Sequence, residues 1–320
     1  MITVAGFNTA IDRFIQLEAL NPGEVHRVRA EHVYPGGKGV HVAQTIAALG
    51  EPVQLIGLVD AAHRTLIDRR MRERGVAFHG IDVGGELRHC LALRDERGTM
   101  TEILGQGPEL SRSECDALLE HFRRSIDESE LVILCGSLLR GLPATIYAEL
   151  VGYARQRGKR CLVDASGNAM RHAIDAKPFM VKPNRDEISE WIGQPVVDLS
   201  AAERAAMALR ESGVAVPVVT MGELGAVAAD ESGVWHAQGS SVHVRNSVGS
   251  GDCFLAGFAV AIKRNMSLDE ALRLAVASGV ANAQTEETGF AERSSVESLL
   301  PSVKVSRLRK PENAHGTSPR

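Results

Sequence analysis

The chain has 320 residues, of which 44% are hydrophobic and 24% are charged, and its formal net charge is -4. This is enough sequence for one large α/β domain or two small ones, and the mildly acidic balance offers no general basic surface for nucleic acid. The five cysteines are odd in number and form no CxxC pair, which argues against a zinc site and a complete disulfide framework.

The N-terminus reads "MITVAGFNTAID", without a basic segment followed by a long apolar one. No run of about eighteen consecutive apolar residues occurs anywhere in the sequence. We therefore expect no signal peptide and no membrane span. Together with the cysteine pattern, this favours a cytoplasmic protein.

Short apolar runs alternate with amphipathic stretches along the chain. The runs typical of strands buried on both faces are 2–7, 52–59, 131–137, 160–166, 179–184 and 216–222. Helical patterns, such as those at 115–129 and 144–158, lie between them. This alternation predicts a mostly parallel sheet covered by helices.

Two segments depart from this rhythm, about 12–35 and 88–105. They alternate apolar and polar residues around turn signals at Asn21-Pro22-Gly23 and Asp95-Glu96-Arg97-Gly98. This is typical of hairpins with one solvated face, so we expect a small antiparallel lid outside the main sheet. The polar residues 306–320 are expected to form a disordered tail after a single domain at 1–305.

The segment "PGGKGVHVAQTIAALG" places Gly36, Gly37 and Lys38 immediately before a helical pattern. Backbone donors and one ammonium would then converge on a phosphate or a polyhydroxylated substrate. The spacing differs from a Walker A loop, and "VAGFNTA" lacks the dinucleotide GxGxxG pattern. The alternatives are a tight strand-to-helix turn for the glycines and a solvated first-turn position for Lys38.

The segment "SVGSGDCFLAGFAVAIKR" places Gly249, Ser250, Gly251 and Asp252 at the start of another helical pattern. Unpaired N–H groups and partial positive charge at a helix start suit an anion. The aspartate there is either a helix cap or a catalyst.

Seven motifs occur together: "NTAID", "GGKGVHVA", "GSLLRG", "VKPNRDE", "TMGELG", "SVGSGD" and "TEETGF". In this order the chain resembles the PfkB (ribokinase-like) carbohydrate kinases, in particular the 1-phosphofructokinase and tagatose-6-phosphate kinase branch, from residue 1 to about 295. The resemblance implies a three-layer α/β/α fold, a β lid through which subunits often dimerise, and Mg-dependent transfer of the ATP γ-phosphate to a sugar or sugar-phosphate hydroxyl.

The resemblance also implies roles at the helix start. Asp252 matches the catalytic base, and the amides of Gly249, Ser250 and Gly251 match the anion hole that holds the migrating phosphoryl group. Phosphoryl transfer needs both features side by side, because charge builds on the migrating group while the acceptor hydroxyl loses its proton.

On the nucleotide side, the resemblance assigns magnesium and phosphate to Asn184 and Glu187, through water, as Mg²⁺ dehydrates reluctantly. The ATP contacts that it implies are Lys182, Thr220, Gly222 and Gly225. The alternatives are a strand-to-helix turn with an exposed Glu at 184–187, a simple strand end at Lys182, and a plain hairpin turn for the two glycines.

On the acceptor side, Asp12 matches the residue that accepts hydrogen bonds from sugar hydroxyls, and is otherwise a surface residue at the lid hinge. The positions that match a site for the substrate phosphate are Lys38, Arg88 and Ser137, with Gly36 and Gly37 in the preceding turn. Arg140 adds a cation where Ser or Pro is common. A guanidinium can grip phosphate with two bonds, while a solvated lid arginine is the alternative for Arg88.

The departures from the family pattern lie mostly around the acceptor. His41 stands where Asn is usual, Thr9 and Leu139 stand where Pro is usual, and Cys90 stands where Asn is common. A neutral imidazole has one donor and one acceptor, so His41 is predicted to contact a sugar hydroxyl, with a structural role as the alternative.

We therefore expect an ATP- and Mg²⁺-dependent kinase of a phosphorylated ketohexose, most like 1-phosphofructokinase, that works as a homodimer through the lid. The alternatives within the enzyme class are a tagatose-6-phosphate kinase, a 6-phosphofructokinase or a kinase of an unphosphorylated sugar. A sugar-sensing binding protein is the alternative outside it.

Overall fold

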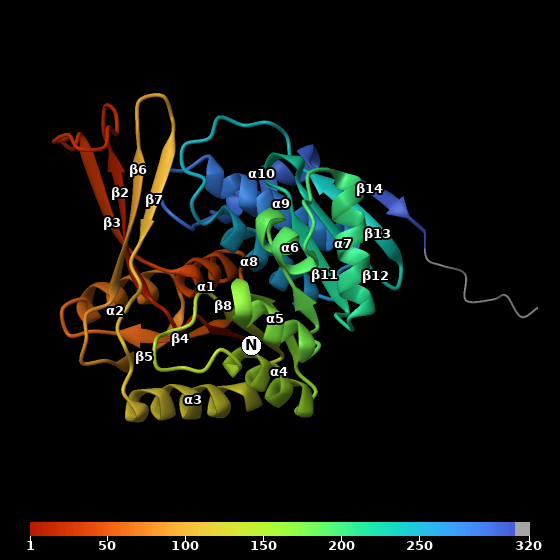
Figure 1. Ribbon diagram of the computed structural model, residues 1–320, viewed down its shortest axis with the longest axis horizontal. Helices are drawn as coiled ribbons and strands as arrows, with labels where there is room; N and C mark the ends of the chain where they lie inside the picture. Colours follow the sequence, from red (N-terminus) through yellow and green to blue (C-terminus); the bar gives the residue numbers. More distant parts are fainter. Residues whose placement is uncertain (311–320) are drawn as a thin grey trace, which may run out of the picture.

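A computed structural model describes residues 1–310 and shows a helix-covered sheet with a smaller sheet projecting from one end (Figure 1). The main sheet has ten strands in the order β14-β13-β12-β11-β10-β9-β8-β1-β4-β5. The seven strands β5, β4, β1, β8, β9, β10 and β11 pair in parallel with one another in this order. The other three, β12, β13 and β14, are antiparallel to their neighbours. The bounds are β1 Ile2–Ala5, β4 Val53–Val59, β5 Ala77–Asp82, β8 Leu131–Cys135, β9 Arg160–Asp164, β10 Met180–Val181, β11 Val216–Thr220, β12 Ala226–Asp230, β13 Gly233–Gln238 and β14 Lys304–Arg309.

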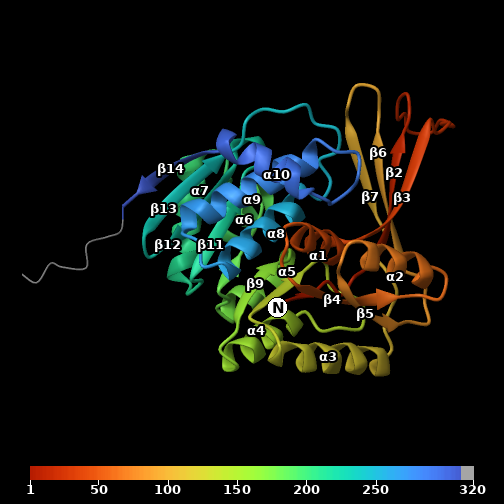
Figure 2. The same ribbon diagram turned by 180° about the vertical axis from the view of Figure 1, so that it is seen from behind.

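Helices cover both faces of this sheet, as the two opposite views show (Figures 1 and 2). One face carries α1 Lys38–Ala48, α2 Arg64–Glu73, α8 Ser250–Lys263, α9 Leu268–Ala283 and α10 Arg293–Leu299. The other carries α3 Arg112–Asp127, α4 Ile146–Gln156, α5 Gly167–Asp175, α6 Arg185–Ile192 and α7 Leu199–Glu211. Two short 3₁₀ turns, η1 Gly222–Leu224 and η2 Leu300–Ser302, complete the elements. The three-layer α/β/α expectation is confirmed.

The core explains why these segments form strands. All five residues of β8 and all seven of β4 are buried, as expected for central strands covered on both faces. Helix α8 is also buried along most of its length, from Asp252 to Ile262, because it packs between α1 and α9. No helix within the described residues is long and apolar enough to cross a membrane.

The smaller sheet is the predicted lid. It contains β2 Ala10–Gln16, β3 Ala30–Gly36, β6 Arg88–Arg94 and β7 Met100–Leu104, in the order β3-β2-β6-β7. Both expected hairpins are antiparallel, but they join through a parallel pairing of β2 with β6. In both views the lid rises from the end of the main sheet that carries β4 and β5 (Figures 1 and 2).

Two expected boundaries are corrected. The apolar run at 179–184 contributes only the two residues of β10, because Pro183 offers no N–H and Asn184 already caps α6. Residues 306–309, expected to belong to a disordered tail, instead form the end of β14 with backbone partners from β13, and Val305 packs against the core. The remainder of that expected tail, 311–320, lies outside the described residues.

Candidate active site

A cavity of about 470 Å³ lies where the lid meets the main sheet. Its lining combines lid strands with α1, the start of α8 and the loops after β8 and β9. The predicted site residues that line it are Asp12, Gly37, Lys38, His41, Arg88, Ser137, Lys182, Asn184, Glu187, Thr220, Gly249, Gly251 and Asp252. The predicted residues outside the lining are Gly36, Arg140, Gly222, Gly225 and Ser250.

His41 connects the two carboxylates expected to act on the acceptor. Its Nδ1 lies 2.7 Å from Oδ2 of Asp252, and its Nε2 lies 2.8 Å from Oδ2 of Asp12. All three residues are buried, with 4%, 7% and 6% of their surfaces exposed in the order His41, Asp252, Asp12. Both ring nitrogens are therefore occupied, so His41 does not offer a free nitrogen to a sugar hydroxyl, which differs from the contact expected from the sequence.

Asp12 keeps one carboxylate oxygen available. Its Oδ1 is buried and has no hydrogen-bond partner among residues 1–310. A buried acceptor without a donor is costly, and a sugar hydroxyl in the cavity would satisfy it. Gly36 explains how the carboxylate fits, because a Cβ at that position would lie 2.0 Å from Cγ of Asp12. Gly36 thus supports the site without lining it.

The start of α8 is shaped by close contact between two backbones. Gly249 is the N-cap residue with a φ of 82°, and a Cβ there would lie 2.3 Å from Cα of Gly289. Asp252 follows in the first helical turn, but its Oδ2 contacts His41 at 2.7 Å. The Ser250 hydroxyl accepts a hydrogen bond from Asn282 at 3.0 Å, which ties α8 to α9. The carboxylate is thus held toward the cavity by a side chain from another helix.

Two lysines meet at one buried carboxylate, that of Asp164 at the end of β9. Lys38 donates to Oδ1 at 2.8 Å, and Nζ of Lys182 lies 3.0 Å from Oδ2 in a direction that makes an ion pair but not a hydrogen bond. Burial raises the pKa of Asp164, but the charges of Lys182 and Lys38 outweigh it and lower the pKa overall. Burial lowers the pKa of Lys38, and the charges of Asp164 and Asp252 outweigh it and raise the pKa.

Of the three other predicted contacts to a substrate phosphate, Arg88 and Ser137 line the cavity and Arg140 does not. Arg88 lines the cavity, donates to the carbonyl of Asn8 at 3.0 Å, and has a buried Nε without a partner in the described part of the chain. The hydroxyl of Ser137 accepts from Nδ2 of Asn8 at 2.9 Å. Arg140 instead donates to the carbonyl of Gly107 at 3.1 Å and pairs with Glu109, so it faces away from the lining.

The side expected to hold the nucleotide is built from a local turn. Asn184 caps α6 by accepting from the amides of Asp186 and Glu187 at 2.9 Å, and Glu187 accepts from the amide of Asn184 at 2.8 Å. Both side chains also line the cavity, as does Thr220. Gly222 and Gly225 lie in and after η1 with positive φ, which fits the turn alternative for these glycines.

The departures from the family pattern separate into two groups. Thr9 is buried, and its hydroxyl accepts from the amide of Leu58 in β4 at 2.9 Å. Leu139 is also buried in the core. His41 and Cys90 line the cavity, and burial raises the pKa of the Cys90 thiol to about 11, which keeps it neutral.

Sequence reasoning missed four polar side chains that line the cavity: Glu102, Asp164, Ser166 and Thr288. Asp164 carried a usable signal, because it ends a buried parallel strand, and sites of open α/β sheets lie outside the carboxyl ends of strands. Glu102 on β7 had no such signal. Burial and the charges of Asp252 and Asp12 raise its pKa, and the nearby His41 opposes them.

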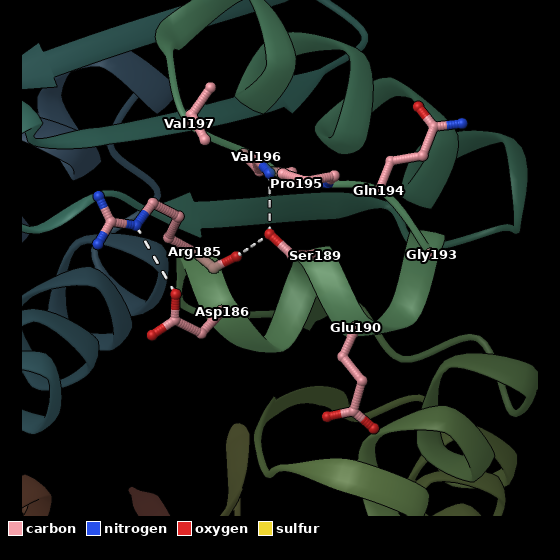
Figure 3. A pocket seen from close by; sticks show the side chains of 9 residues that line it. All are labelled: Arg185, Asp186, Ser189, Glu190, Gly193, Gln194, Pro195, Val196 and Val197. Carbon is pink, nitrogen blue, oxygen red and sulfur yellow. Dashed lines mark hydrogen bonds and ion pairs between the residues drawn. The ribbon is translucent and has the colours of Figure 1, made fainter.

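A larger and more open depression of about 670 Å³ lies along α6 and the turn after it (Figure 3). Arg185 pairs with Asp186 there, and the hydroxyl of Ser189 bonds the carbonyl of Arg185 and the amide of Val196. No charged residue that lines this depression is buried. It therefore lacks the converging charges of the cavity beneath the lid.

Comparison with known proteins identifies the kind of molecule. Residues 5–294 match the model of the pfkB family carbohydrate kinases. The chain belongs to the pfkB family of carbohydrate kinases. It is a phosphotransferase with an alcohol group as acceptor and uses ATP, as the family does.

Individual relatives support this membership. The chain is 34% identical over 308 residues to the 1-phosphofructokinase of Bacillus subtilis, covering 96% of this chain and 100% of that protein. A structure of phosphofructokinase-2 from Escherichia coli with substrates and products is 24% identical, with a TM-score of 0.87 over 94% of this chain and 98% of that one. The ribokinase of Arabidopsis thaliana with ribose and ATP is 22% identical, with a TM-score of 0.76 over 93% and 98% of the two chains. The ribokinase-like fold expected from the sequence is confirmed.

Proposed function

We propose that this pfkB family kinase transfers the γ-phosphate of ATP to a hydroxyl of a phosphorylated ketohexose, and that it is most like 1-phosphofructokinase. The observation that carries the proposal is the arrangement of Asp252 and Asp12, two buried carboxylates joined through His41 at one wall of the cavity. One carboxylate is available as a base and the other as an anchor for the sugar.

In this proposal Asp252 takes the proton of the attacking hydroxyl. The oxygen of that hydroxyl then forms a bond to the γ-phosphorus while the bond to the β-phosphate oxygen breaks. The amides at the start of α8 stabilise charge on the migrating group, because they lie at the positive end of the helix dipole. Asp12 orients the sugar through its Oδ1, which has no partner among the described residues.

Cations on both sides of the cavity suit two phosphorylated substrates. Arg88 lies on the lid side with a buried Nε that lacks a partner in the described chain, which supports a contact to the phosphate of the acceptor. Lys38 and Lys182 converge on Asp164 between the acceptor and nucleotide sides, and Lys182 serves ATP phosphate. Ser137 adds a neutral donor near Arg88.

The residues of this chain fit a hydrated Mg²⁺. Among residues 1–310 no cluster of three or more His, Cys, Asp or Glu is arranged to hold a metal directly. Asn184 and Glu187 line the cavity with hard oxygen ligands, which would hold the ion through water. When bound, Mg²⁺ would supply positive charge to ATP phosphate oxygens. In this proposal Lys182 and Thr220 contact the same phosphates directly.

The lid also supports a homodimer. Its strands and turns expose the apolar side chains of Val25, Val28, Val33, Ile103 and Leu104, with Val25 94% exposed. Exposed apolar clusters of this kind mark interaction surfaces. Light scattering of the wild type and of Ile103→Lys tests this, and we expect a dimer that the lysine weakens; a monomeric wild type contradicts it.

A substrate panel tests the proposed reaction. The measurement is kcat/KM for fructose 1-phosphate, fructose 6-phosphate and tagatose 6-phosphate against free fructose, tagatose and ribose. We expect the phosphorylated set to be at least about tenfold better, the effect of one charged contact worth roughly 1.4 kcal/mol. A preference for fructose 6-phosphate or tagatose 6-phosphate selects one of the alternatives, and a preference for a free sugar overturns the acceptor class.

A further inference from the structure

His41 is the residue of this site whose geometry goes furthest beyond the proposed reaction. It lies in the second turn of α1 with 4% of its surface exposed. One ring nitrogen faces Asp12 of the lid sheet and the other faces Asp252 of α8, at 2.8 and 2.7 Å. The ring thus joins residues 29 and 211 positions away in the chain.

The two contacts have a chemical requirement. A neutral imidazole has one N–H donor and one bare nitrogen, so it can donate to only one of the two carboxylates. In that form its bare nitrogen would face a carboxylate oxygen, and two lone pairs would oppose each other. Only the imidazolium donates to both Asp12 and Asp252.

The surrounding charges favour that form. Burial by itself lowers the pKa of His41, but hydrogen bonds to Asp12 and Asp252, together with the negative charge of both, outweigh it and raise the pKa to about 10. Glu102 of β7 adds negative charge from the lid. Lys38, one turn earlier on α1, is paired with Asp164, while Cys90 of β6 is neutral.

Backbone packing holds the ring in this orientation. Gly289 has a φ of 66°, and a Cβ there would lie 2.0 Å from Cγ of His41. Gln44 donates to the carbonyl of Gly289 at 2.8 Å, and the neighbouring Glu287 bonds Arg70 of α2 and Arg74, the C-cap residue of that helix. The loop 285–290 is therefore tied to two helices, which prevents the ring from turning away.

We propose that His41 is a positioning residue that fixes the catalytic base Asp252 and the sugar-binding carboxylate of Asp12 relative to each other by donating one hydrogen bond to each. Oδ2 of Asp252 is fixed by Nδ1, so its other oxygen is directed to the acceptor hydroxyl. Oδ2 of Asp12 is fixed by Nε2, so its Oδ1, without a partner in residues 1–310, is directed to the sugar. The enzyme then works only while both ring nitrogens carry protons. This inference rests on the proposed roles of Asp12 and Asp252.

The first test uses the wild type and requires no catalysis. The measurement is the protonation of His41 by nitrogen NMR of histidine-labelled protein between pH 6 and 10.5, assigned by comparison with His41→Gln. We expect both ring nitrogens to be protonated up to about pH 9, and Asp12→Asn or Asp252→Asn to move the titration to lower pH. A neutral ring at pH 8 in the wild type overturns the inference.

The second test is kinetic and uses whichever sugar the substrate panel identifies. We expect His41→Asn and His41→Gln to lower kcat at pH 7.5 by at least about tenfold, the effect of one lost charge-assisted bond, with KM for ATP within about twofold. Because the enzyme needs a protonated His41, kcat of the wild type should fall near pH 10. This fall should be absent in both variants. A fall of kcat near pH 10 that persists in both variants, as it would if lysines caused it, overturns the positioning role.

The two tests separate this inference from the proposed function. A protonated His41 in a protein that phosphorylates no phosphorylated ketohexose leaves the bridge intact and overturns only the acceptor class. A protonated His41 with unchanged kcat in His41→Asn overturns the positioning role while leaving the kinase reaction in place.

Discussion

The proposed acceptor side and the proposed nucleotide side of the cavity are built in different ways. On the acceptor side, Asp12, His41 and Asp252 come from a lid strand and two helices, and their contacts span up to 211 positions of sequence. On the nucleotide side, Asn184 and Glu187 satisfy each other across one helical turn. Asp164 lies between them and pairs with Lys38 on one side and Lys182 on the other.

This difference has a physical consequence. A capping box depends on four consecutive residues, so it forms wherever the helix forms. The contacts among Asp12, His41 and Asp252 depend on correct placement of the lid, α1 and α8 relative to one another. These three residues are almost completely buried. Changes on the acceptor side should therefore affect the chemical step strongly and ATP binding weakly.

The most severe test of this comparison is Asp252→Asn. Removing the base should lower kcat by on the order of a hundredfold or more, because the effect falls on the transition state, while the affinity for ATP stays within a few fold. Steady-state kinetics with both substrates measure it. A variant that retains near wild-type kcat contradicts the assignment of Asp252 as the base.

Asp164→Asn tests the residue between the two sides. The substitution leaves Lys182, a side chain only 5% exposed, next to Lys38 without a counter-charge. Breaking a buried ion pair in this way should cost about 3 kcal/mol of unfolding free energy. Urea unfolding measures it, with Asp127→Asn as the control, because the Arg157–Asp127 pair is exposed and worth at most about 1 kcal/mol. Equal losses in both variants would contradict the buried pairing.

Arg88→Ala and Arg140→Ala form a matched pair on the acceptor side. Arg88 lines the cavity, whereas Arg140 pairs with Glu109 outside it. We expect Arg88→Ala to remove most of the roughly tenfold preference for phosphorylated sugars, and Arg140→Ala to change kcat/KM by less than about twofold. The opposite order of effects would place the substrate phosphate beside Arg140.

The smallest expected effect concerns stability against pH. Burial lowers the pKa of His41, but Asp12 and Asp252 outweigh it and raise the pKa from 6.5 to about 10. A raised pKa in the folded state means that this contribution to stability is complete below about pH 6.5 and is lost as pH rises toward 10. We expect Tm to fall by a few degrees between pH 7 and pH 9, about 1–2 kcal/mol, and to fall less in His41→Asn. Equal slopes for the two proteins would show that His41 is not charged when folded.

The sequence predicted much of the fold because its signals are local. Continuous apolar runs identified central strands such as β4 and β8, and alternating patterns identified the lid hairpins. The family motifs also led to most of the residues that line the cavity. Local signals were insufficient at chain boundaries, since β14 depends on pairing with β13 and on the packing of Val305.

The sequence by itself determined the α/β/α class, the lid and the two glycine-lined helix starts, since periodicity and turn residues depend on neighbouring positions. Tertiary structure alone decided which departures face the cavity: Thr9 and Leu139 are buried in the interior, while His41 and Cys90 line the cavity. It also decided that Arg140 turns toward Glu109 and that both nitrogens of His41 are occupied. These outcomes follow from contacts between residues far apart in the chain, whose distances and burial no local pattern encodes.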